Sequence, residues 1–309
     1  MNDATVPHSA DALLEGVWNI VPTPFTDSGD LDTPSLATLT DFVVDRGVNG
    51  MTILGVLGEA AKLSDAERLA VIEGVMARAA GRVPICVGVS APSTARAIGY
   101  GREAQERGAH SVMLAPPQLA RPNDGAVRAH YLAVADAIQL PVVVQDHPAS
   151  SGVWMTVELL LELAAASPRL RVIKLEDEPT PPKAGRILAA DPTLRVLGGL
   201  GGQMLIEELR RGCVGTMTGF GYPEILVDIV GRYRAGDHDG ATLAFHRACP
   251  LIRFENQAGL NLPIRKFIYQ RRGAITNARV RTPGPALDPG TIADLDDLIT
   301  HLGLASGES

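Results

Sequence analysis

The sequence predicts an α/β protein, a (β/α)8 TIM barrel with a C-terminal helical extension. Eight short apolar runs recur about every 30 residues, each followed by a segment of helical periodicity. The runs lack strict polar alternation, which is typical of parallel strands buried on both faces. Eight such units in succession favour a barrel over a doubly wound open sheet, for which no topological switch can be located. The runs are 17–21, 50–54, 84–89, 111–114, 141–144, 170–173, 194–197 and 214–217.

Start and stop signals support helices between these runs. Ser64, followed three residues later by Glu67, is a capping box that begins a helix. Further expected caps are Ser93 and Thr156, and the glycines expected to end helices are Gly47, Gly108 and Gly212.

The chain is predicted to have three parts: a tail (1–13), the barrel (14–236) and the extension (237–309). The last barrel helix is expected at about 224–235, and about 70 residues follow it. Their helical patterns cover 238–256, 262–272 and a segment after Pro289. Because a closed barrel needs no further element, we expect these helices to pack on one side of it.

Composition narrows the class of protein. The 309 residues carry a net charge of −7 and no long basic run, which disfavours nucleic acid as a partner. No stretch approaches the roughly 20 apolar residues of a membrane helix, and residues 1–15 do not resemble a signal peptide. The three cysteines stand in no metal-ligand spacing. We therefore expect a cytoplasmic protein with buried, reduced cysteines and no metal, and without a membrane partner.

Polar residues directly after the strands are the candidates for chemistry, because active sites of such barrels lie at the C-terminal strand ends. The chain has four lysines, and Lys174 is the one that follows a strand. A desolvated amine there would be nucleophilic, although an ion pair with a carboxylate of 176–178 explains the residue equally well. Lys62, Lys183 and Lys266 are expected to have solvated roles.

Three other strand ends carry candidate residues. Glu59 follows a Gly-x-x-Gly turn and is expected to anchor the loop rather than act as a pocket acid. Asp146 and His147 are candidates for acid or base catalysis, but Asp146 is equally suited to stabilising a turn. The glycine run 198–202 favours a tight turn with close substrate approach over an anion cradle, since no phosphate-binding lysine accompanies it.

Motifs in the right order resemble the dihydrodipicolinate synthase / N-acetylneuraminate lyase family. They are Val21-Pro22-Thr23-Pro24-Phe25, Gly55-x-x-Gly58-Glu59-x-x-x-Leu63-Ser64 and Lys174. The resemblance covers about residues 14–305 and implies a class I, Schiff-base lyase or aldolase on a 2-keto acid, usually a homotetramer. It implies a covalent lysine imine and no cofactor. Val56 and Leu57 replace the family's hydroxyl residues and Gln145 replaces its strand-five tyrosine, which disfavours ordinary dihydrodipicolinate synthase activity.

Further segments look like a subgroup of that family, the 2-keto-3-deoxy-L-arabonate dehydratases, which also lack the strand-five tyrosine. These segments are 144–150, 174–176, 215–219 and 254–257. The resemblance implies dehydration of a 2-keto-3-deoxy sugar acid to 2,5-dioxopentanoate, in carbohydrate catabolism. Expected catalytic residues are Lys174, Glu176 and Gln145, and expected substrate-binding residues are Thr23, Val56, Leu57, Gly58, Glu59, Asp146, His147, Gly199 and Thr218.

Details of this reaction and three other functions stay open. A base for C3 and an acid for C4 are required, and Glu176 and the 145–147 turn are the candidates. Because Val56 and Leu57 lack side-chain donors, the N–H groups of Leu57 and Gly58 are expected to hold the substrate carboxylate. The alternatives are a retro-aldol lyase that releases pyruvate, dihydrodipicolinate synthase, and a non-catalytic sugar-acid binder.

Overall fold

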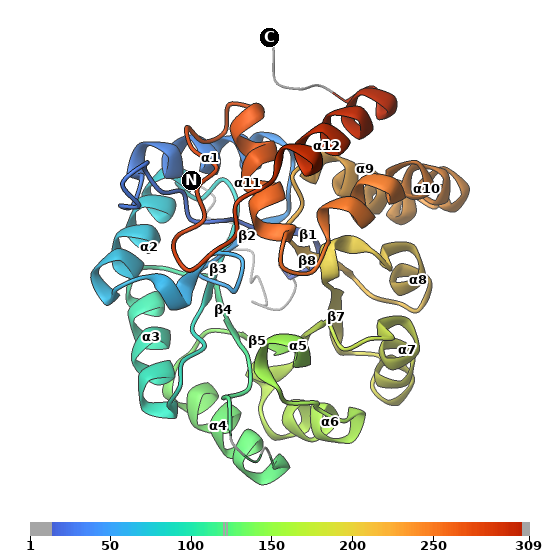
Figure 1. Cartoon of the computed structure of the whole chain (residues 1–309). Coiled ribbons are helices and arrows are strands. Elements are labelled where there is room, and N and C mark those ends of the chain that lie inside the picture. Colours follow the sequence, from blue (N-terminus) through green and yellow to red (C-terminus); the bar gives the residue numbers. More distant parts are fainter. Residues whose placement is uncertain (1–13, 120, 122, 305–309) are drawn as a thin grey trace, which may run out of the picture.

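The computed structural model describes residues 14–119, 121 and 123–304 and contains a closed barrel of eight parallel strands in sequence order (Figure 1). The predicted (β/α)8 barrel is thereby confirmed, and the doubly wound sheet is excluded. The strands are β1 Gly16–Ile20, β2 Gly50–Ile53, β3 Ile85–Gly88, β4 Ser111–Leu114, β5 Val142–Asp146, β6 Val172–Leu175, β7 Arg195–Gly198 and β8 Gly215–Thr218.

A ring of helices surrounds the strands, and three further helices form the extension (Figure 1). The ring contains α1 Thr33–Asp45, α2 Asp65–Ala79, α3 Thr94–Glu106, α4 Asp124–Ala137, α6 Val157–Ala166, α7 Thr180–Ala190, α8 Leu205–Arg210 and α9 Pro223–Arg234. Short helices in the loops are α5 Pro148–Ser151, η2 Ala60–Lys62, η3 Pro168–Leu170 and η4 Leu200–Gly202. The extension contains α10 His238–Glu255, α11 Asn261–Arg271 and α12 Pro289–Leu302.

The predicted helix signals are confirmed. The Ser64 hydroxyl accepts the Glu67 N–H, and the Glu67 carboxylate accepts the Ser64 N–H, as in a capping box. The hydroxyl groups of Ser93 and Thr156 accept the N–H groups of Arg96 and Leu159 and so cap α3 and α6, without the reciprocal bond. The glycines that follow the ends of α1, α3 and α8 all have positive φ: Gly47, Gly108 and Gly212.

Strands β5 and β6 extend two residues further than the predicted runs 141–144 and 170–173. Gln145 pairs with Lys174 across the two strands, so both lie in the barrel wall rather than after it. The polar character of these positions predicts that each strand ends before them, but both strands continue. They continue the ladder because their side chains find buried partners, which are described below.

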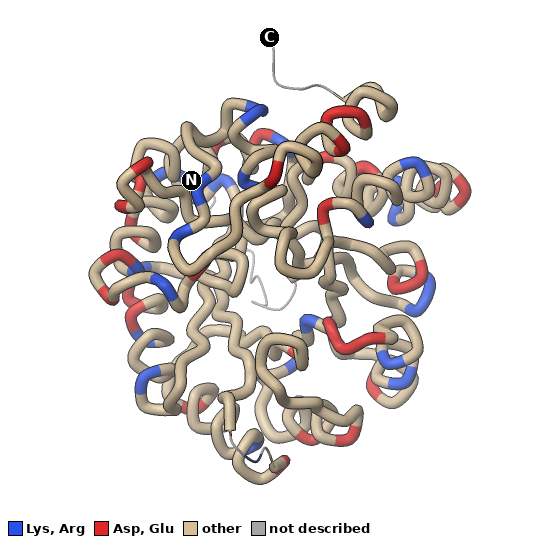
Figure 2. The backbone as a smooth tube through the Cα atoms, in the orientation of Figure 1, with Lys and Arg blue, Asp and Glu red and all other residues tan. Residues whose placement is uncertain are grey.

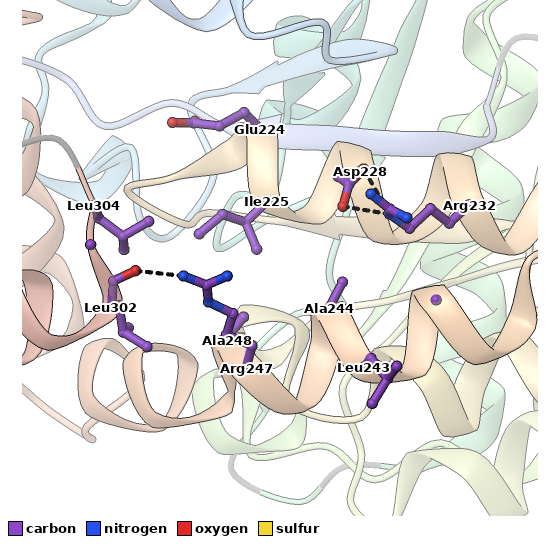
Figure 3. A pocket seen from close by; sticks show the side chains of 12 residues that line it. Glu224, Ile225, Asp228, Arg232, Leu243, Ala244, Arg247, Ala248, Leu302 and Leu304 are labelled. Atoms are coloured by element: carbon purple, nitrogen blue, oxygen red, sulfur yellow. Dashed lines mark hydrogen bonds and ion pairs between the residues drawn. The ribbon is translucent and has the colours of Figure 1, made fainter.

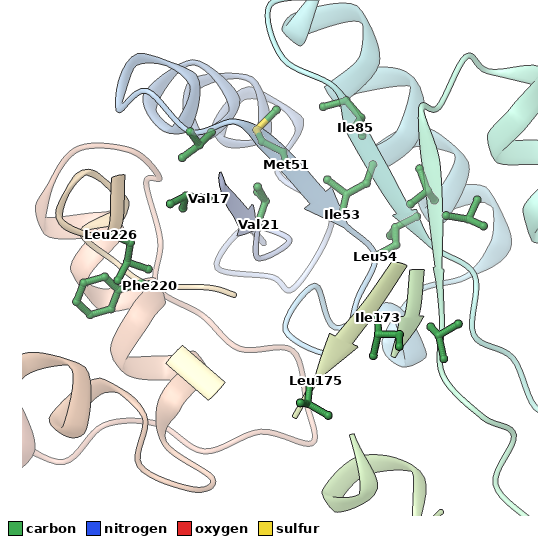
Figure 4. Packing of buried hydrophobic residues seen from close by; sticks show 14 of the residues in the cluster. Val17, Val21, Met51, Ile53, Leu54, Ile85, Ile173, Leu175, Phe220 and Leu226 are labelled. Atoms are coloured by element: carbon green, nitrogen blue, oxygen red, sulfur yellow. The ribbon is translucent and has the colours of Figure 1, made fainter. Parts of the chain in front are cut away.

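Side chains alternate between the two faces of each strand. Those that face outward, such as Val17, Ile53 and Ile173, join the core between the strands and the helices (Figure 4). Those that face inward, such as Trp18 and Met113, fill a second cluster within the barrel. The interior is thus packed with side chains and is not an open pore.

The strand register arranges the inward side chains in tiers, each drawn from alternate strands, with a stagger of about one residue per strand. We define a floor tier, a lysine tier above it, a glycine tier, and a mouth tier beyond the strand ends. In that order the tiers contain Trp18, Cys86, Val143 and Leu197; Thr52, Met113, Lys174 and Met217; Ile20, Gly88, Gln145 and Gly199; and Ala115, Glu176 and Gly219.

The extension packs on one side of the barrel. Helix α10 contacts α8 and α9, and α12 contacts α10 (Figure 1). Charged residues of both signs are distributed over the outer helices rather than gathered on one face (Figure 2). Within the described residues, none of the helices combines the length and the apolar character needed to cross a membrane.

Candidate active site

The ammonium group of Lys174 and the carboxylate of Glu176 form an ion pair inside the barrel. Nζ of Lys174 lies 2.9 Å from Oε2 of Glu176, and the two side chains are 2% and 8% exposed. The expected alternative, an ion pair, therefore exists, but it does not exclude nucleophilic chemistry. A carboxylate at this distance can accept the proton that the amine must lose before it attacks a carbonyl.

Gln145 holds Glu176 above Lys174. Its Nε2 donates to Oε2 of Glu176 at 2.9 Å, and the Glu176 N–H donates to the Asp146 carbonyl at 2.8 Å. Burial raises the pKa of the Glu176 carboxyl, but the interactions of this carboxylate with Lys174, His147 and Gln145 together outweigh burial, and the pKa lies below its ordinary value. The structure thus brings together the three residues predicted to be catalytic, with Glu176 ionised.

Gly199 lies in the glycine tier, and because it has no side chain, Glu176 can occupy the space beside it. A Cβ atom at Gly199 would lie 2.3 Å from Cγ of Glu176, a distance at which something must move. Gly88 has the same role on the other side of the barrel, where a Cβ would lie 2.1 Å from the Leu54 carbonyl oxygen. Both glycines of this tier therefore admit groups from neighbouring loops above Lys174.

The glycine run after β7 forms the expected tight turn. Gly201 and Gly202 have φ of 66° and 80°, which side chains rarely adopt. The Gly201 N–H donates to the Thr218 hydroxyl at 2.8 Å, and the Asn256 side chain donates to the Leu200 carbonyl at 2.9 Å. Thr218 alternates with the inward Met217, so it supports this turn from the outer face of β8.

The turn after β2 is built differently from the predicted carboxylate site. The Gly58 N–H, which was expected to bind the substrate carboxylate, donates to the Gly55 carbonyl at 3.0 Å. The Leu57 N–H makes no hydrogen bond within the described residues and can still bind an oxygen. Val56 is 57% exposed, and the Thr23 hydroxyl donates to the Gly58 carbonyl at 2.6 Å. Thr23 therefore fixes the turn.

Glu59 anchors this turn to the extension, as predicted. Its Oε2 accepts the Arg281 N–H at 3.0 Å and the Lys62 ammonium at 2.9 Å, while Oε1 lies 2.5 Å from Nζ of Lys266. The expectation that Lys266 is solvated is wrong, because its side chain is 0% exposed and lies over the Phe25 ring. Burial lowers the pKa of Lys266 to about 8.

Asp146 and Lys183 form a pair on the outer face of β5. Nζ of Lys183 lies 2.6 Å from Oδ2 of Asp146 and 2.8 Å from Oδ2 of Asp177, so a solvated role for this lysine is also wrong. Burial raises the pKa of Asp146 to about 6, despite this lysine. Asp146 therefore stabilises the wall, and its neighbour His147 contacts the Ser150 hydroxyl through Nδ1 at 2.7 Å.

Sequence patterns missed a further buried ion pair, at the mouth of the barrel. Nε of Arg265 donates to Oε1 of Glu255 at 2.6 Å, and both side chains are 1% exposed. Glu255 also accepts the Gly221 N–H at 2.8 Å. Segment 254–257 carries no local signal for a contact with the loop after β8, although it contributes to the family resemblance.

Two grooves formed by the described residues lie on the outside of the barrel and do not contain the predicted catalytic residues. The groove in Figure 3, with a volume of about 590 Å³, lies between α9, α10 and the end of α12 and is lined by residues such as Ile225, Leu243 and Leu302. Among the described residues, no group of His, Cys, Asp and Glu side chains is arranged to hold a metal ion.

Comparison with known proteins agrees with this architecture. The sequence matches the dihydrodipicolinate synthetase family over residues 13–302. It is 33% identical to an L-2-keto-3-deoxyarabonate dehydratase from Azospirillum brasilense over 289 residues, which cover 91% of this chain and 92% of that protein. It is 30% identical to a 4-hydroxy-tetrahydrodipicolinate synthase from Methanosphaerula palustris, with 93% and 99% of the two chains covered.

A solved structure shares both fold and sequence. The crystal structure of a dihydrodipicolinate synthase from Rhodopseudomonas palustris superimposes with a TM-score of 0.87 at 36% identity, over 93% of this chain and 97% of that one. The match extends across the barrel and the extension, so the two structures share both parts.

Proposed function

Because the chain belongs to the dihydrodipicolinate synthetase family of lyases, we propose that it dehydrates 2-keto-3-deoxy-L-arabonate to 2,5-dioxopentanoate through an imine on Lys174. The observation that carries this proposal is the buried Lys174–Glu176 pair held by Gln145. The similarity to the Azospirillum brasilense dehydratase supports the choice of substrate.

Imine formation begins with a proton transfer from Lys174 to Glu176. The neutral amine then attacks C2 of the 2-keto acid, and the C2 oxygen leaves as water after protonation by Glu176. The Leu57 N–H is the backbone donor proposed to hold the substrate carboxylate.

Elimination follows from the electron-withdrawing imine. It makes a C3 proton acidic, and the Glu176 carboxylate removes this proton to give an enamine. Glu176 then returns the proton to the C4 hydroxyl, which leaves as water. Loss of a C5 proton and protonation at C3 then give the C5 enol, which becomes the aldehyde. Hydrolysis with one water releases 2,5-dioxopentanoate and restores Lys174.

Borohydride reduction in the presence of 2-keto-3-deoxy-L-arabonate tests the imine, and mass spectrometry of peptides locates it. We expect the added mass on Lys174, while the peptides with Lys62, Lys183 and Lys266 serve as internal controls. A semialdehyde dehydrogenase coupled to the reaction measures the product. An unmodified Lys174 under conditions where the substrate binds would contradict the mechanism.

Retro-aldol cleavage is the second candidate, because it uses the same imine but breaks C3–C4 and releases pyruvate. Coupling to lactate dehydrogenase distinguishes it from dehydration. Dihydrodipicolinate synthase activity is less favoured, since Val56 and Leu57 carry no hydroxyl groups, and condensation with aspartate semialdehyde is expected to be absent. A non-catalytic sugar-acid binder would give neither product.

We also propose that the active assembly is a cytoplasmic homotetramer that requires no cofactor. Family membership supports the oligomer, and the lysine imine supplies the electron sink that a cofactor would otherwise provide. Light scattering coupled to size-exclusion chromatography measures the mass of the assembly, and a monomeric active enzyme would contradict the tetramer.

A further inference from the structure

Arg265 of the extension fills a position in the mouth of the barrel that β8 leaves empty. A Cβ atom at Gly219 would lie 2.5 Å from Nη1 and 2.8 Å from Cζ of Arg265. Gly219 continues the alternation of the inward Met217, so its missing side chain would point into the barrel. The guanidinium group of α11 therefore takes the place of a side chain in the mouth tier, where Glu176 also lies.

The guanidinium group is fixed in this position. Its Nε donates to Oε1 of Glu255 at 2.6 Å, and Oε2 of Glu255 accepts the Gly221 N–H at 2.8 Å. Both carboxylate oxygens are thus occupied, and the pair is 1% exposed on each side. The negative charge of Glu255 balances the positive charge of Arg265, so the corner is close to neutral.

One donor of this group has no partner. Nη1 of Arg265 is buried and makes no hydrogen bond within the described residues. Leaving a charged donor unsatisfied in the interior is costly, and native proteins rarely do so without a reason. Lys174 is covered to a similar extent, with 2% of its side chain exposed. Nη1 therefore remains available to a ligand group in the mouth tier.

We propose that Nη1 of Arg265 donates a hydrogen bond to the terminal hydroxyl of the substrate and thereby selects sugar acids with an uncharged polar end. This inference rests on the proposed function, which places C2 at Lys174 and the carboxylate at the Leu57 N–H. The remaining carbons then run toward β7 and β8, where Gly199 and Gly219 carry no side chains of their own. A second carboxylate would be disfavoured there, because Glu255 neutralises Arg265 and Glu176 repels it.

The test compares two substrates that differ only at the far end. 2-Keto-3-deoxy-L-arabonate ends in a hydroxymethyl group, and 4-hydroxy-2-oxopentanoate ends in a methyl group. The wild-type enzyme should prefer the first by about tenfold to a hundredfold in kcat/KM for loss of the C4 hydroxyl. In a Glu255→Gln/Arg265→Gln variant, which keeps an uncharged hydrogen-bonded pair, this preference should fall to a few-fold.

Two controls separate recognition from folding. Arg265→Lys keeps the charge but loses the fixed fork of donors, so it should recover only part of the preference. Arg253→Gln, on the exposed side of α10, should leave the preference unchanged. Equal losses on both substrates, with the preference retained, would show a merely structural role and overturn the inference. So would a wild-type preference for the dicarboxylate 4-hydroxy-2-oxoglutarate that the double variant abolishes.

Failure of the dehydratase proposal can be told apart from failure of this inference. If the enzyme forms no 2,5-dioxopentanoate, the rates of borohydride trapping on Lys174 with the same two compounds replace kcat/KM. A trapping preference that depends on Arg265 supports the inference even then, and equal trapping rates for both compounds in the wild type contradict it.

Discussion

The ammonium group of Lys266, in the extension, lies 2.5 Å from the carboxylate of Glu59, at the turn after β2. The two residues are 207 positions apart in the chain, and neither side chain is more than 1% exposed. The turn that carries the proposed carboxylate donor, Leu57, is therefore fixed by a helix outside the barrel. The extension is part of the construction of the active site.

Lys266→Met should lower the free energy of unfolding by about 3–5 kcal/mol, because it leaves the Glu59 carboxylate buried without its main partner. Lys62→Met is the matched control, since Lys62 contacts the same carboxylate but its side chain is 24% exposed. That change should cost about 1 kcal/mol or less. Urea denaturation at pH 7 measures the free energy of unfolding of both variants. Equal losses would contradict the claim that Lys266 is the main partner of Glu59.

Glu208→Gln should change how stability depends on pH. Burial raises the pKa of Glu208 to about 7, because Oε2 has no partner and Oε1 has only the Thr180 hydroxyl at 2.6 Å. The folded wild type thus keeps a proton that the unfolded chain loses near pH 4.5. Its stability falls by about 3 kcal/mol as the pH rises from 4.5 to 7, and the variant should lack this loss. Urea denaturation at pH 5 and pH 8 measures this difference. If the free energy of unfolding changes equally with pH in the wild type and the variant, the role assigned to Glu208 is contradicted.

Gly199→Ala and Gly198→Ala should have different effects, although the residues are adjacent. The first Cβ would lie 2.3 Å from Cγ of Glu176 inside the barrel, and the second 1.7 Å from Oε2 of Glu208 outside it. Gly199→Ala should slow borohydride trapping about tenfold or more by displacing Glu176. Gly198→Ala should mainly lower stability, by about 1–3 kcal/mol. Trapping rates per folded molecule separate these outcomes, and a reversed pattern would contradict the orientation assigned to the two faces.

Gln145→Glu should shift the acidic limb of the pH profile of kcat/KM to higher pH, by about one pH unit or more. The new carboxyl would take the place of an amide that lies 2.9 Å from Glu176, and two carboxylates so close cannot both ionise readily. Gln145→Ala removes the hydrogen bond without adding charge and serves as the control. An acidic limb that stays in place in Gln145→Glu would show that Glu176 does not govern the rate.

Chelation should leave the reaction unchanged. Since the proposed chemistry uses only protein groups and a lysine imine, enzyme dialysed against EDTA should keep its full kcat. Recovery of lost activity on adding back a divalent metal would contradict the absence of a metal requirement.

Local patterns predicted the barrel and Lys174 because their information lies in short segments. A capping box at Ser64 or an apolar run such as 111–114 needs only its immediate neighbours, and the structure contains both. The lengths of β5 and β6 were less predictable, since Gln145 and Lys174 remain in the sheet through contacts with Glu176, on a loop.

Buried charges were the part that the sequence could not predict. Lys266, Lys183 and Arg265 have the appearance of surface residues on helices, which is where such side chains most often lie. Their burial depends on carboxylates supplied by distant loops, and no periodicity in a helix indicates such a partner. The role of Gly219 was hidden for the same reason, because the side chain that occupies its space comes from α11.

The floor tier has a consequence for the traffic of water. Trp18, Cys86, Val143 and Leu197 are all 0% exposed and close the barrel below Lys174. Because these side chains block that end of the barrel, water that reaches Lys174 is expected to come from the opposite end, where Glu176 lies. Water released when the imine forms, water expelled from C4 and water needed for hydrolysis would then all pass this carboxylate.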